Sequence, residues 1–444
     1  MAAAGLCIGC GGCAVGQAPL GWDRFGQLKP AGDWAAERSA RVAQVCPFSP
    51  HARDEDMIAG ERFPDAATHD ARIGRHEAAY VGHVAEGDHR ARGSSGGMVS
   101  WVAAELLARG AIDGVVHVVP TDPARDGRFF DYGISRTAAE IAEGARSRYY
   151  PVELSRVLAA IRAQPGRYAV VGVPCFIKAV HLARGHDPVL RERIAFTLGL
   201  FCGHMKSARF VESFAWQLGV PMREVRAVEY RRKDPDRPAN WYTAHLTLAD
   251  GSAQWRDWWH LVDGDWGAGY FQNSACNYCD DVVAETADVA FGDAWVEPYS
   301  SDGRGTNVVI TRAPEVQRLI ADAIAGGRLA LAAVDADFIV ETQAAGFRQR
   351  REGLAYRLRI APPRLPLRKR VAPGGATLPL RRKLVYRARR SISAGSHRMF
   401  ALARTLRWPA LYLVWARAVL RGYEALTYLR GPLGGWVRRV LGER

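Results

Sequence analysis

Four cysteines in the first fifty residues suggest the chemistry that this chain performs. Three of them, Cys7, Cys10 and Cys13, follow the pattern C-x-x-C-x-x-C within a glycine-rich stretch. The fourth, Cys46, is followed by Pro47 and comes thirty-three positions after Cys13. This pattern is typical of ferredoxin-like loops, in which three thiolates on one tight turn and a fourth from elsewhere hold a 4Fe–4S cluster. The glycines let backbone amides turn toward the sulfurs.

Zinc and disulfides are weaker interpretations of the same cysteines. A zinc site more typically shows two separate C-x-x-C pairs than three thiols within seven residues. A disulfide framework suits small secreted domains, whereas this chain has 444 residues and shows no signal-peptide pattern. We therefore expect an iron–sulfur cluster on residues 1–52, with little regular structure apart from a short hairpin at Asp23–Pro30.

Four further cysteines lie in the body of the chain. Cys175 and Cys202 each follow an apolar run that we expect to be a core strand. Because ligands bind at the carboxyl ends of strands in open α/β sheets, two cysteines at equivalent strand ends are harder to explain as inert packing. Cys276 and Cys279 form a C-x-x-C pair. These four thiols are enough to ligate a second cluster, and zinc remains an alternative for this set.

Alternating strand and helix patterns predict an α/β fold with a mixed sheet. We expect strands at 80–84, 113–119, 167–173, 194–201, 287–291 and 306–311, an antiparallel pair at 224–231 and 242–248, and helices at 98–109, 152–162 and 315–325. Residues 53–75 are polar and indicate a connector. The predicted divisions are a ferredoxin-like segment at 1–52, two body domains at 75–163 and 164–345, and a basic tail at 361–444.

A glycine- and serine-rich turn, Ser94–Gly97, separates the first of these strands from its helix. A turn that opens a helix points free amide groups at an anion, and glycine lets a phosphate approach the backbone. The turn matches neither the dinucleotide nor the Walker fingerprint, so its spacing alone favours a helix N-cap by Ser94 or Ser95. Arg148 and the tyrosines after it fit either a grip on a cofactor or an ordinary helix entry with Pro151 near its first turn.

The net charge of +14 is concentrated at the carboxyl end. From Leu365 onward the chain has 18 Lys and Arg against 2 Asp and Glu, so the preceding residues carry a net charge of −2. A nucleic-acid-binding surface on the body is therefore not supported. Residues 361–383 are rich in proline and basic side chains and indicate a linker or a flexible arm. No run of eighteen apolar residues occurs, so we expect no membrane-spanning helix.

Residues 398–430 follow a helical pattern with a broad apolar stripe and arginines on the other side. The stripe consists of Trp408, Leu411, Tyr412, Trp415, Val419, Tyr423 and Leu426, and the arginines are Arg407, Arg417 and Arg421. Such a helix either lies in an anionic membrane interface or docks on the body or on a partner, and the pattern favours neither role.

Taken together, these segments resemble the coenzyme F-420 hydrogenase/dehydrogenase beta subunit family. That family includes deazaflavin-reducing subunits of archaeal enzymes and flavin and iron–sulfur reductases of chlorophyll metabolism. The matching pieces are collinear over roughly residues 1–345. They are Cys7–Cys13, Ser94–Gly97, Ile112–Val116, Ser147–Pro151, Val171–Cys175, Leu198–Gly203, Cys276–Asp280 and Gly292–Trp295. Phe176 departs from the family, which often has Gln after the Cys of its V-P-C segment, and the tail after about residue 360 has no counterpart.

The resemblance implies FAD in the α/β body and one or two 4Fe–4S clusters. The residues that match positions near the flavin are Ser94, Ser95, Gly96, Gly97, Ser147, Arg148 and Tyr149. The residues that match positions near a cluster are Cys175, Cys202, Cys276 and Cys279. Asp293 and Arg148 are candidates for tuning the flavin or delivering protons, because they lie in matching motifs.

By this resemblance the chain is an iron–sulfur flavoprotein oxidoreductase. Electrons from a ferredoxin-type donor would enter at the first four cysteines, pass a second cluster and reach FAD, which would reduce an organic substrate or a deazaflavin. The resemblance also suggests a homo- or hetero-oligomer, a link to polysaccharide synthesis, and a cytoplasmic location, either free or on the inner face of a membrane. Three other classes stay open: a non-catalytic electron-transfer subunit, a zinc-stabilised binding protein, and a nucleic-acid binder acting through the tail.

Overall fold

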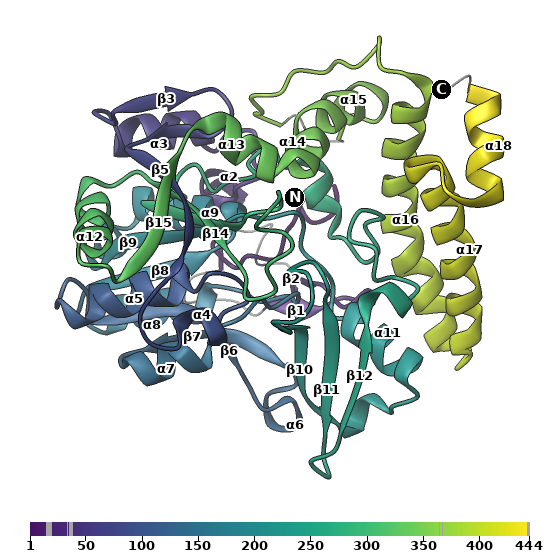
Figure 1. Ribbon diagram of the computed structural model, residues 1–444, viewed down its shortest axis with the longest axis horizontal. Helices are drawn as coiled ribbons and strands as arrows, with labels where there is room; N and C mark the ends of the chain where they lie inside the picture. Colours follow the sequence, from purple (N-terminus) through teal and green to yellow (C-terminus); the bar gives the residue numbers. More distant parts are fainter. Residues whose placement is uncertain (15–19, 33, 35–38, 364, 366, 442–444) are drawn as a thin grey trace.

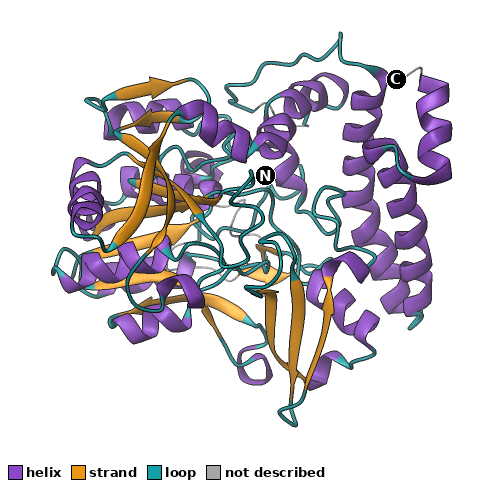
Figure 2. Cartoon of the chain, viewed as in Figure 1, coloured by secondary structure: helices purple, strands orange, loops and turns teal. Residues whose placement is uncertain are grey.

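An eight-stranded mixed sheet forms the centre of the fold (Figure 1; Figure 2). The computed structural model describes residues 1–14, 20–32, 34, 39–363, 365 and 367–441. Four strands in the middle of the sheet run parallel, and antiparallel strands lie on both sides of them. From one edge to the other the strands are β15 (Leu329–Val334), β5 (Ala78–Val84), β14 (Asn307–Thr311), β13 (Val289–Asp293), β9 (Ile194–Leu200), β8 (Tyr168–Gly172), β6 (Gly114–Pro120) and β7 (Phe130–Ser135). The predicted α/β class with a mixed sheet is confirmed.

Apolar side chains alternate between the two faces of this sheet, and helices cover both faces. Val115 packs into the core on one face, and its neighbour Val116 packs into the core on the other. The helices of the first face are α5 (Met98–Ala108), α7 (Ala138–Glu143) and α12 (Pro314–Ala325). Those of the second are α8 (Ser155–Ala163), α9 (Pro174–His186) and α10 (Pro188–Arg193). Burial on both faces explains why the parallel strands are nearly continuous apolar runs.

The strands and helices that the sequence predicts for the body are present within a few residues of their expected bounds. One detail is wrong: Pro151 does not lie in the first turn of a helix, because α8 begins only at Ser155. Three strands were not predicted, namely β7, β12 and β15. The sequence of β15, Leu329–Val334, is half alanine, and alanine favours helix over strand when tertiary contacts are ignored.

A second, smaller sheet packs beside the large one. It contains β10 (Val225–Arg232), β11 (Thr243–Leu248) and β12 (Ala253–Asp257), all antiparallel, with α11 (Arg209–Leu218) against it. The predicted antiparallel pair is therefore confirmed and is extended by one strand. Short helical turns connect other parts of the body: α4 (His89–Arg92), α6 (Pro123–Asp126), η1 (Met222–Glu224), η2 (Trp258–His260) and η3 (Ser274–Tyr278).

The amino-terminal segment has more regular structure than its sequence indicates. The predicted hairpin is present as β1 (Leu20–Trp22) paired with β2 (Leu28–Pro30). The helix α2 (Ser39–Val45) precedes Cys46, and the expected connector contains α3 (Glu55–Arg62) and a hairpin of β3 (Thr68–Asp70) with β4 (Gly74–His76). Asp54 caps α3, since its side chain accepts a hydrogen bond from the amide of Met57.

A series of helices begins at Ala336 and continues beyond residue 345, where the body was expected to close. They are α13 (Ala336–Thr342), α14 (Ala344–Arg350), α15 (Glu352–Ile360), α16 (Leu380–Thr405), α17 (Pro409–Tyr428) and α18 (Gly431–Leu441). The single helical stretch predicted over 398–430 is wrong, because α16 ends at Thr405 and α17 begins at Pro409. Proline cannot donate the next helical hydrogen bond, and Arg407 just before it has φ of +51°.

The long helices α16, α17 and α18 form a layer at the right of Figure 1, on the far side of the small sheet from the large one. The apolar stripe of α17 faces the body. Tyr412 and Tyr423 are buried, and the hydroxyl of Tyr412 donates to Asp263 at 3.0 Å. The stripe therefore docks on the body, which was one of its two predicted roles, although Trp408 at its beginning is exposed.

The segment between the body and these helices is held in place. Lys369 and Arg370 form ion pairs with buried carboxylates, and α16 already begins at Leu380. The prediction that residues 361–383 form a flexible arm is therefore wrong for the described residues of this range. Within the described part of the chain, no helix combines the length and the apolar character that crossing a bilayer requires.

If the helical layer is part of the fold, its core contacts must stabilise the whole chain. Phe400 is fully buried and stacks on Trp216 of α11 with ring centroids 4.1 Å apart. We expect Phe400→Ala to lower the free energy of unfolding by about 3–5 kcal/mol, and the exposed neighbour Leu406→Ala to change it by less than about 0.5 kcal/mol. Chemical denaturation of both variants checks this. Equal, small effects would show that the layer is not docked.

Candidate functional site

The first four cysteines lie near one another, although Cys46 comes from a separate segment. Burial, and after it the charges of the neighbouring thiols, raises the pKa of Cys10, and the same two causes raise the pKa of Cys13 to about 12. Burial is also the main cause that raises the pKa of Cys46 to about 11, with Cys7 adding to it. Helix α2 places Cys46 there, because Val45 at its end packs in the same apolar cluster as Cys13.

The turn that carries Cys7, Cys10 and Cys13 requires its glycines. Gly9 and Gly11 have φ of +79° and +74°. A Cβ on Gly11 would lie 2.3 Å from a carboxylate oxygen of Glu153, and one on Gly9 would lie 2.5 Å from the carbonyl oxygen of Leu28. Any side chain at these two positions would therefore push the turn away from the body.

The other four cysteines line one small, partly enclosed cavity of about 10 Å³. Cys175 lies in the first turn of α9, Cys202 follows β9, Cys276 lies in η3, and Cys279 comes directly after it. Burial is the main cause that raises their thiol pKa, to about 11 for Cys202 and about 12 for Cys276. All eight cysteines of the chain lie in the described part and are free thiols. The fold thus collects four thiols that are far apart in the sequence.

Arg350 completes this cavity, and sequence reasoning missed it. The side chain is buried, and its Nη1 donates to the sulfur of Cys279 and to the carbonyl oxygen of Asp281. Its Nη2 donates to the carbonyl oxygens of Cys202 and Gly203 at 2.7 and 2.8 Å. Burial opposes the charge of the guanidinium, but the neighbouring thiolates raise the pKa of Arg350 overall. A fixed positive charge therefore lies against the second set of cysteines.

The two sets of cysteines adjoin. Burial, and after it the other three cysteines of its own set, raise the pKa of Cys175, and Cys10 of the first set adds a smaller effect. Burial, and then Cys175 and Cys10, raise the pKa of Tyr132. Ile8, between Cys7 and Cys10, lines the cavity of the second set. As the side chains stand, no group of three or more His, Cys, Asp or Glu among the described residues could hold a metal ion.

The Ser94–Gly97 turn presents four backbone amides, none of which donates a hydrogen bond within the described residues. Its carbonyl groups, in contrast, are all engaged. Arg231 donates to the carbonyl of Ser94 at 3.3 Å, Lys233 donates to that of Ser95 at 2.9 Å, and the amides of Val84 and Trp101 bind the other two. The turn thus combines amides that have no acceptor among the described residues with two cations bound at its carbonyls, and both features favour an anion.

The expected N-cap by Ser94 or Ser95 is wrong. The hydroxyl of Ser94 accepts the amide of Ser147 at 2.7 Å, and the hydroxyl of Ser95 donates to the carbonyl of Thr306 at 2.8 Å. Gly97, with φ of +87°, is the residue before α5 and has no side chain to cap it, and the first amide of the helix, that of Met98, instead donates to Oδ1 of Asn307 at 3.1 Å. The serines therefore hold the turn to two other segments and leave its amides without a side-chain cap.

Aromatic and charged side chains connect this turn with the second set of cysteines. His204, two residues after Cys202, stacks on Trp266 at 4.2 Å, and Trp266 contacts Tyr149 at 4.7 Å. Tyr149 in turn lies near the ion pair in which Arg231 donates to Asp293 at 2.9 Å. Sequence reasoning found Tyr149 and Asp293 but missed His204, Trp266, Arg231 and Lys233, which belong to no motif.

Arg148 has other neighbours. Its guanidinium lies 4.8 Å from the ring centre of Phe130 and donates to the carbonyl of Ala145. Burial lowers its pKa to about 10, and Arg146 adds to that effect. Arg148 and Asp293 thus have different partners, and the catalytic roles predicted for both stay predictions.

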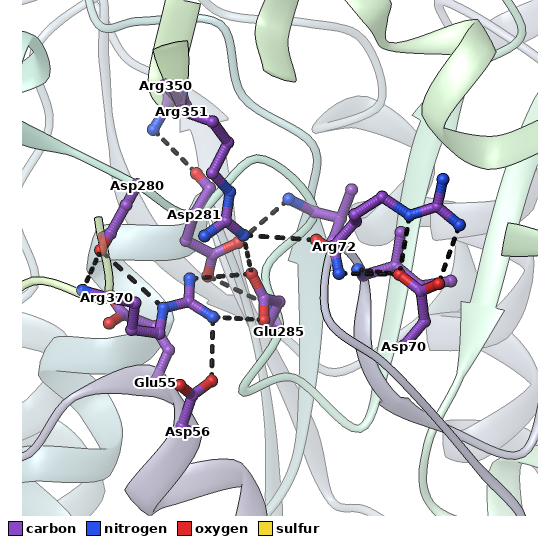
Figure 3. Close-up of polar contacts among 12 residues, drawn as sticks. Glu55, Asp56, Asp70, Arg72, Asp280, Asp281, Glu285, Arg350, Arg351 and Arg370 are labelled. Carbon is purple, nitrogen blue, oxygen red and sulfur yellow. Dashed lines mark hydrogen bonds and ion pairs between the residues drawn. The ribbon is translucent and has the colours of Figure 1, made fainter. Parts of the chain in front are cut away.

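A buried network of ion pairs lies behind Cys279. Figure 3 shows Arg370 between Asp280 and Glu285, with Asp56 on its other side. Lys369 pairs with Asp280 at 3.0 Å, and Glu285 also binds Arg351 at 3.2 Å. Burial disfavours the charge of Asp280, but the two cations of residues 369 and 370 hold its pKa below the usual value. The segment at 369–370 is therefore fastened to the loop that carries the C-x-x-C pair.

An open groove of about 950 Å³ lies along the edge strand β15 and its neighbour β5. The loop at 298–306 forms its wall, with Arg90 and Arg304 both paired to Asp302. The same loop contacts the glycine- and serine-rich turn through the bond from Ser95 to Thr306. The groove was not predicted, and it contains none of the predicted site residues.

The sequence matches two family models, which describe the two ends of the beta subunit of coenzyme F420 hydrogenase/dehydrogenase. The model of the amino-terminal end matches residues 79–159, and the model of the carboxyl-terminal end matches residues 166–337. The matched ranges contain the turn and the second set of cysteines, whereas the first set and the helices after α13 lie outside them. No curated protein matches the chain.

Among solved structures, the chain is similar to one from the F420-reducing [NiFe] hydrogenase complex of Methanosarcina barkeri. The similarity has a TM-score of 0.51 at 17% sequence identity, and it covers 68% of this chain and 99% of the other. At this identity the similarity shows a shared fold.

The ion pairs behind Cys279 should be a major source of stability. We expect Arg370→Gln to lower the free energy of unfolding by about 3–5 kcal/mol, because Glu285 and Asp280 lose a partner in a buried environment. Arg368→Gln, two residues earlier and exposed, should cost less than about 0.5 kcal/mol. Urea denaturation of the two variants decides this, and a similar small cost for both would contradict the role assigned to the network.

Proposed function

Because the chain belongs to the coenzyme F420 hydrogenase/dehydrogenase beta subunit family, we propose that it is an oxidoreductase with two 4Fe–4S clusters and FAD. It would take electrons from a ferredoxin-type donor and reduce an organic substrate or a deazaflavin. The observation that carries the proposal is the presence of two sets of four thiols that adjoin through Cys10 and Cys175. A 4Fe–4S cluster needs four thiolates, and adjoining clusters form a path for electrons.

The residues of each set fit a cluster. Free, buried thiols have raised pKa values, so they become thiolates only when a cation compensates them, and iron supplies that compensation. The first set comprises Cys7, Cys10, Cys13 and Cys46, and the second comprises Cys175, Cys202, Cys276 and Cys279. Arg350 adds a fixed counter-charge to the second set alone. Three cysteines of the first set are partly exposed, namely Cys7, Cys13 and Cys46, against two of the second, so the first set suits the entry of electrons from a donor.

The residues around the turn fit a flavin nucleotide. Unpaired amides at Ser94–Gly97 would bind its phosphates, with Arg231 and Lys233 supplying positive charge. Tyr149 and Trp266 offer aromatic surface between this turn and the second set of cysteines. When bound, a flavin exchanges single electrons with clusters and hydride equivalents with organic molecules, and so joins the two kinds of chemistry.

The chain's own groups would control charge and protons in this region. Burial lowers the pKa of Lys233 to about 8, with Arg90 and Arg231 adding to the effect, and its ammonium group donates to three backbone carbonyls that hold it beside the turn. Arg231 is held by Asp293, and although burial opposes its charge, that carboxylate raises the pKa of the guanidinium. We propose that Arg231 stays charged and that Asp293 is fixed in its orientation by this pair.

The proposed location and the alternative roles of the protein rest on the resemblance and on the chemistry of its cysteines. Eight free thiols suit a reducing compartment, so we propose a cytoplasmic location. The main alternative is an electron-transfer subunit that binds the same cofactors but has its substrate site on a partner. A role in polysaccharide synthesis stays a prediction.

Cofactor analysis tests the proposal. Protein purified without oxygen should contain about eight iron and eight acid-labile sulfide per chain, with one flavin. Cys175→Ser and Cys13→Ser should each remove about half of the iron, because each disables one of two clusters. Stoichiometric zinc without sulfide would favour the binding-protein class, and cofactors without reduction of any deazaflavin would favour the electron-transfer subunit.

Arg350 should set the potential of one cluster. A fixed positive charge stabilises the more negative, reduced state, so Arg350→Gln should lower the reduction potential of the second cluster by on the order of 100 mV. Arg350→Lys should lower it less. Arg351→Gln, whose side chain turns toward Glu285, is the control and should shift it little. Redox titration followed by EPR, on samples of equal iron content, measures these shifts. An unchanged potential in Arg350→Gln would refute the charge argument.

A further inference from the structure

Exposed apolar side chains gather on the carboxyl-terminal helices. Of the fourteen large hydrophobic residues that are exposed among those described, nine lie between Leu380 and Leu441, in α16 to α18 and the turns between them. The body, although several times larger, has only five. Isolated exposed hydrophobics are ordinary on any surface, but such a concentration marks a region that contacts something other than water.

Helix α18 shows the pattern most clearly. Leu433, Trp436 and Val440 are 49%, 54% and 60% exposed. In a helix of about 3.6 residues per turn, these three side chains lie within about 60° of one another. Gly434, in contrast, is buried, and a Cβ there would lie 2.3 Å from the backbone of Leu429. The helix is therefore held against its neighbours by another side and presents an apolar stripe outward.

This layer also carries almost all of the chain's excess positive charge. Residues 380–441 contain fourteen Arg and Lys but one acidic residue, Glu424. Arg438 and Arg439 on α18, and Arg417 and Arg421 on α17, are all exposed. The buried faces of α16 and α17 dock on the body through residues such as Phe400 and Tyr412. The exposed arginines and the apolar stripe thus belong to α17 and α18, which form the outer side of the layer at the right edge of Figure 1.

We propose that this outer side binds the surface of a membrane that contains anionic lipids. Leu433, Trp436 and Val440 enter the boundary between headgroups and acyl chains, where tryptophan is favoured, and the arginines pair with lipid phosphates. The stripe on α17 that suggested a membrane role from sequence is not the one used, since it faces the body. The binding surface is instead built by α18.

Two other occupants fit less well. A nucleic acid would pair with the arginines but would leave the apolar stripe in water. A second copy of the chain would cover the stripe but would bring two strongly positive surfaces together. An anionic bilayer would pair with the arginines and would also cover the apolar stripe.

The membrane proposal does not depend on the cofactors or on the reaction proposed above, so either proposal can fail without the other.

Vesicle sedimentation with the full chain tests this proposal. The protein should bind vesicles of phosphatidylcholine with about one third phosphatidylglycerol, and bind pure phosphatidylcholine much more weakly. Replacing both apolar residues, Leu433→Ser with Trp436→Ser, should weaken binding by about tenfold or more. Replacing both arginines, Arg438→Gln with Arg439→Gln, should weaken it by about fivefold per residue and reduce its dependence on salt.

A matched control comes from the body. Trp255 and Trp259 are as exposed as Trp436 but lie on and after β12, so Trp255→Ser with Trp259→Ser should leave vesicle binding unchanged. Equal binding to neutral and anionic vesicles, or equal effects of the two double variants that remove tryptophan, would overturn the proposal. So would a concentration-dependent dimer that the α18 substitutions abolish, or binding to RNA but not to vesicles.

Discussion

The buried ion pairs behind Cys279 hold together parts of the chain that would otherwise separate. Arg370 lies between the buried carboxylates of Asp280 and Glu285, from the loop after the C-x-x-C pair, and also binds the exposed Asp56 on α3 (Figure 3). Lys369 pairs with Asp280. Buried charges are costly unless each has a partner with good geometry, so such a network admits few alternative arrangements. The network therefore gives the loop that carries Cys276 and Cys279 a rigid support on the side away from the cavity.

The large sheet supplies the other side of the same cavity. Parallel strands β8 and β9 end at one edge and deliver Cys175 and Cys202 there, while the amino-terminal turn brings Ile8 into the lining of the cavity and Cys10 close enough to influence the pKa of Cys175. Arg350, from a helix beyond the expected end of the body, then closes the cavity with a positive charge. The second set of thiols therefore depends on the sheet, on the loop after Cys276 and on a late helix, and no one of these segments would form it alone.

The helices of the basic tail have an inward face and an outward face, and the two faces differ in what they contact. Its inward face is a normal protein core, with Phe400 on Trp216 and Tyr412 on Asp263. Its outward face carries arginines and exposed apolar residues that the body does not cover. Composition alone does not distinguish these faces, because tryptophan, tyrosine and leucine occur on both.

Local patterns in the sequence determined most of the core strands and helices and the first turn of cysteines. Apolar runs bounded by glycine and proline predicted the core strands and helices, and the C-x-x-C-x-x-C spacing predicted the first turn, because both depend on residues that are neighbours in the chain. Tertiary structure alone decided the convergence of the distant cysteines, the role of Arg350, the direction of the α17 stripe, and the use of the serine hydroxyls of Ser94 and Ser95. These depend on contacts between residues far apart in the sequence, and a single sequence contains no local signal for such contacts. The four cysteines in the first fifty residues carry the local pattern that predicts a cluster, but the fold determines which other residues lie near them.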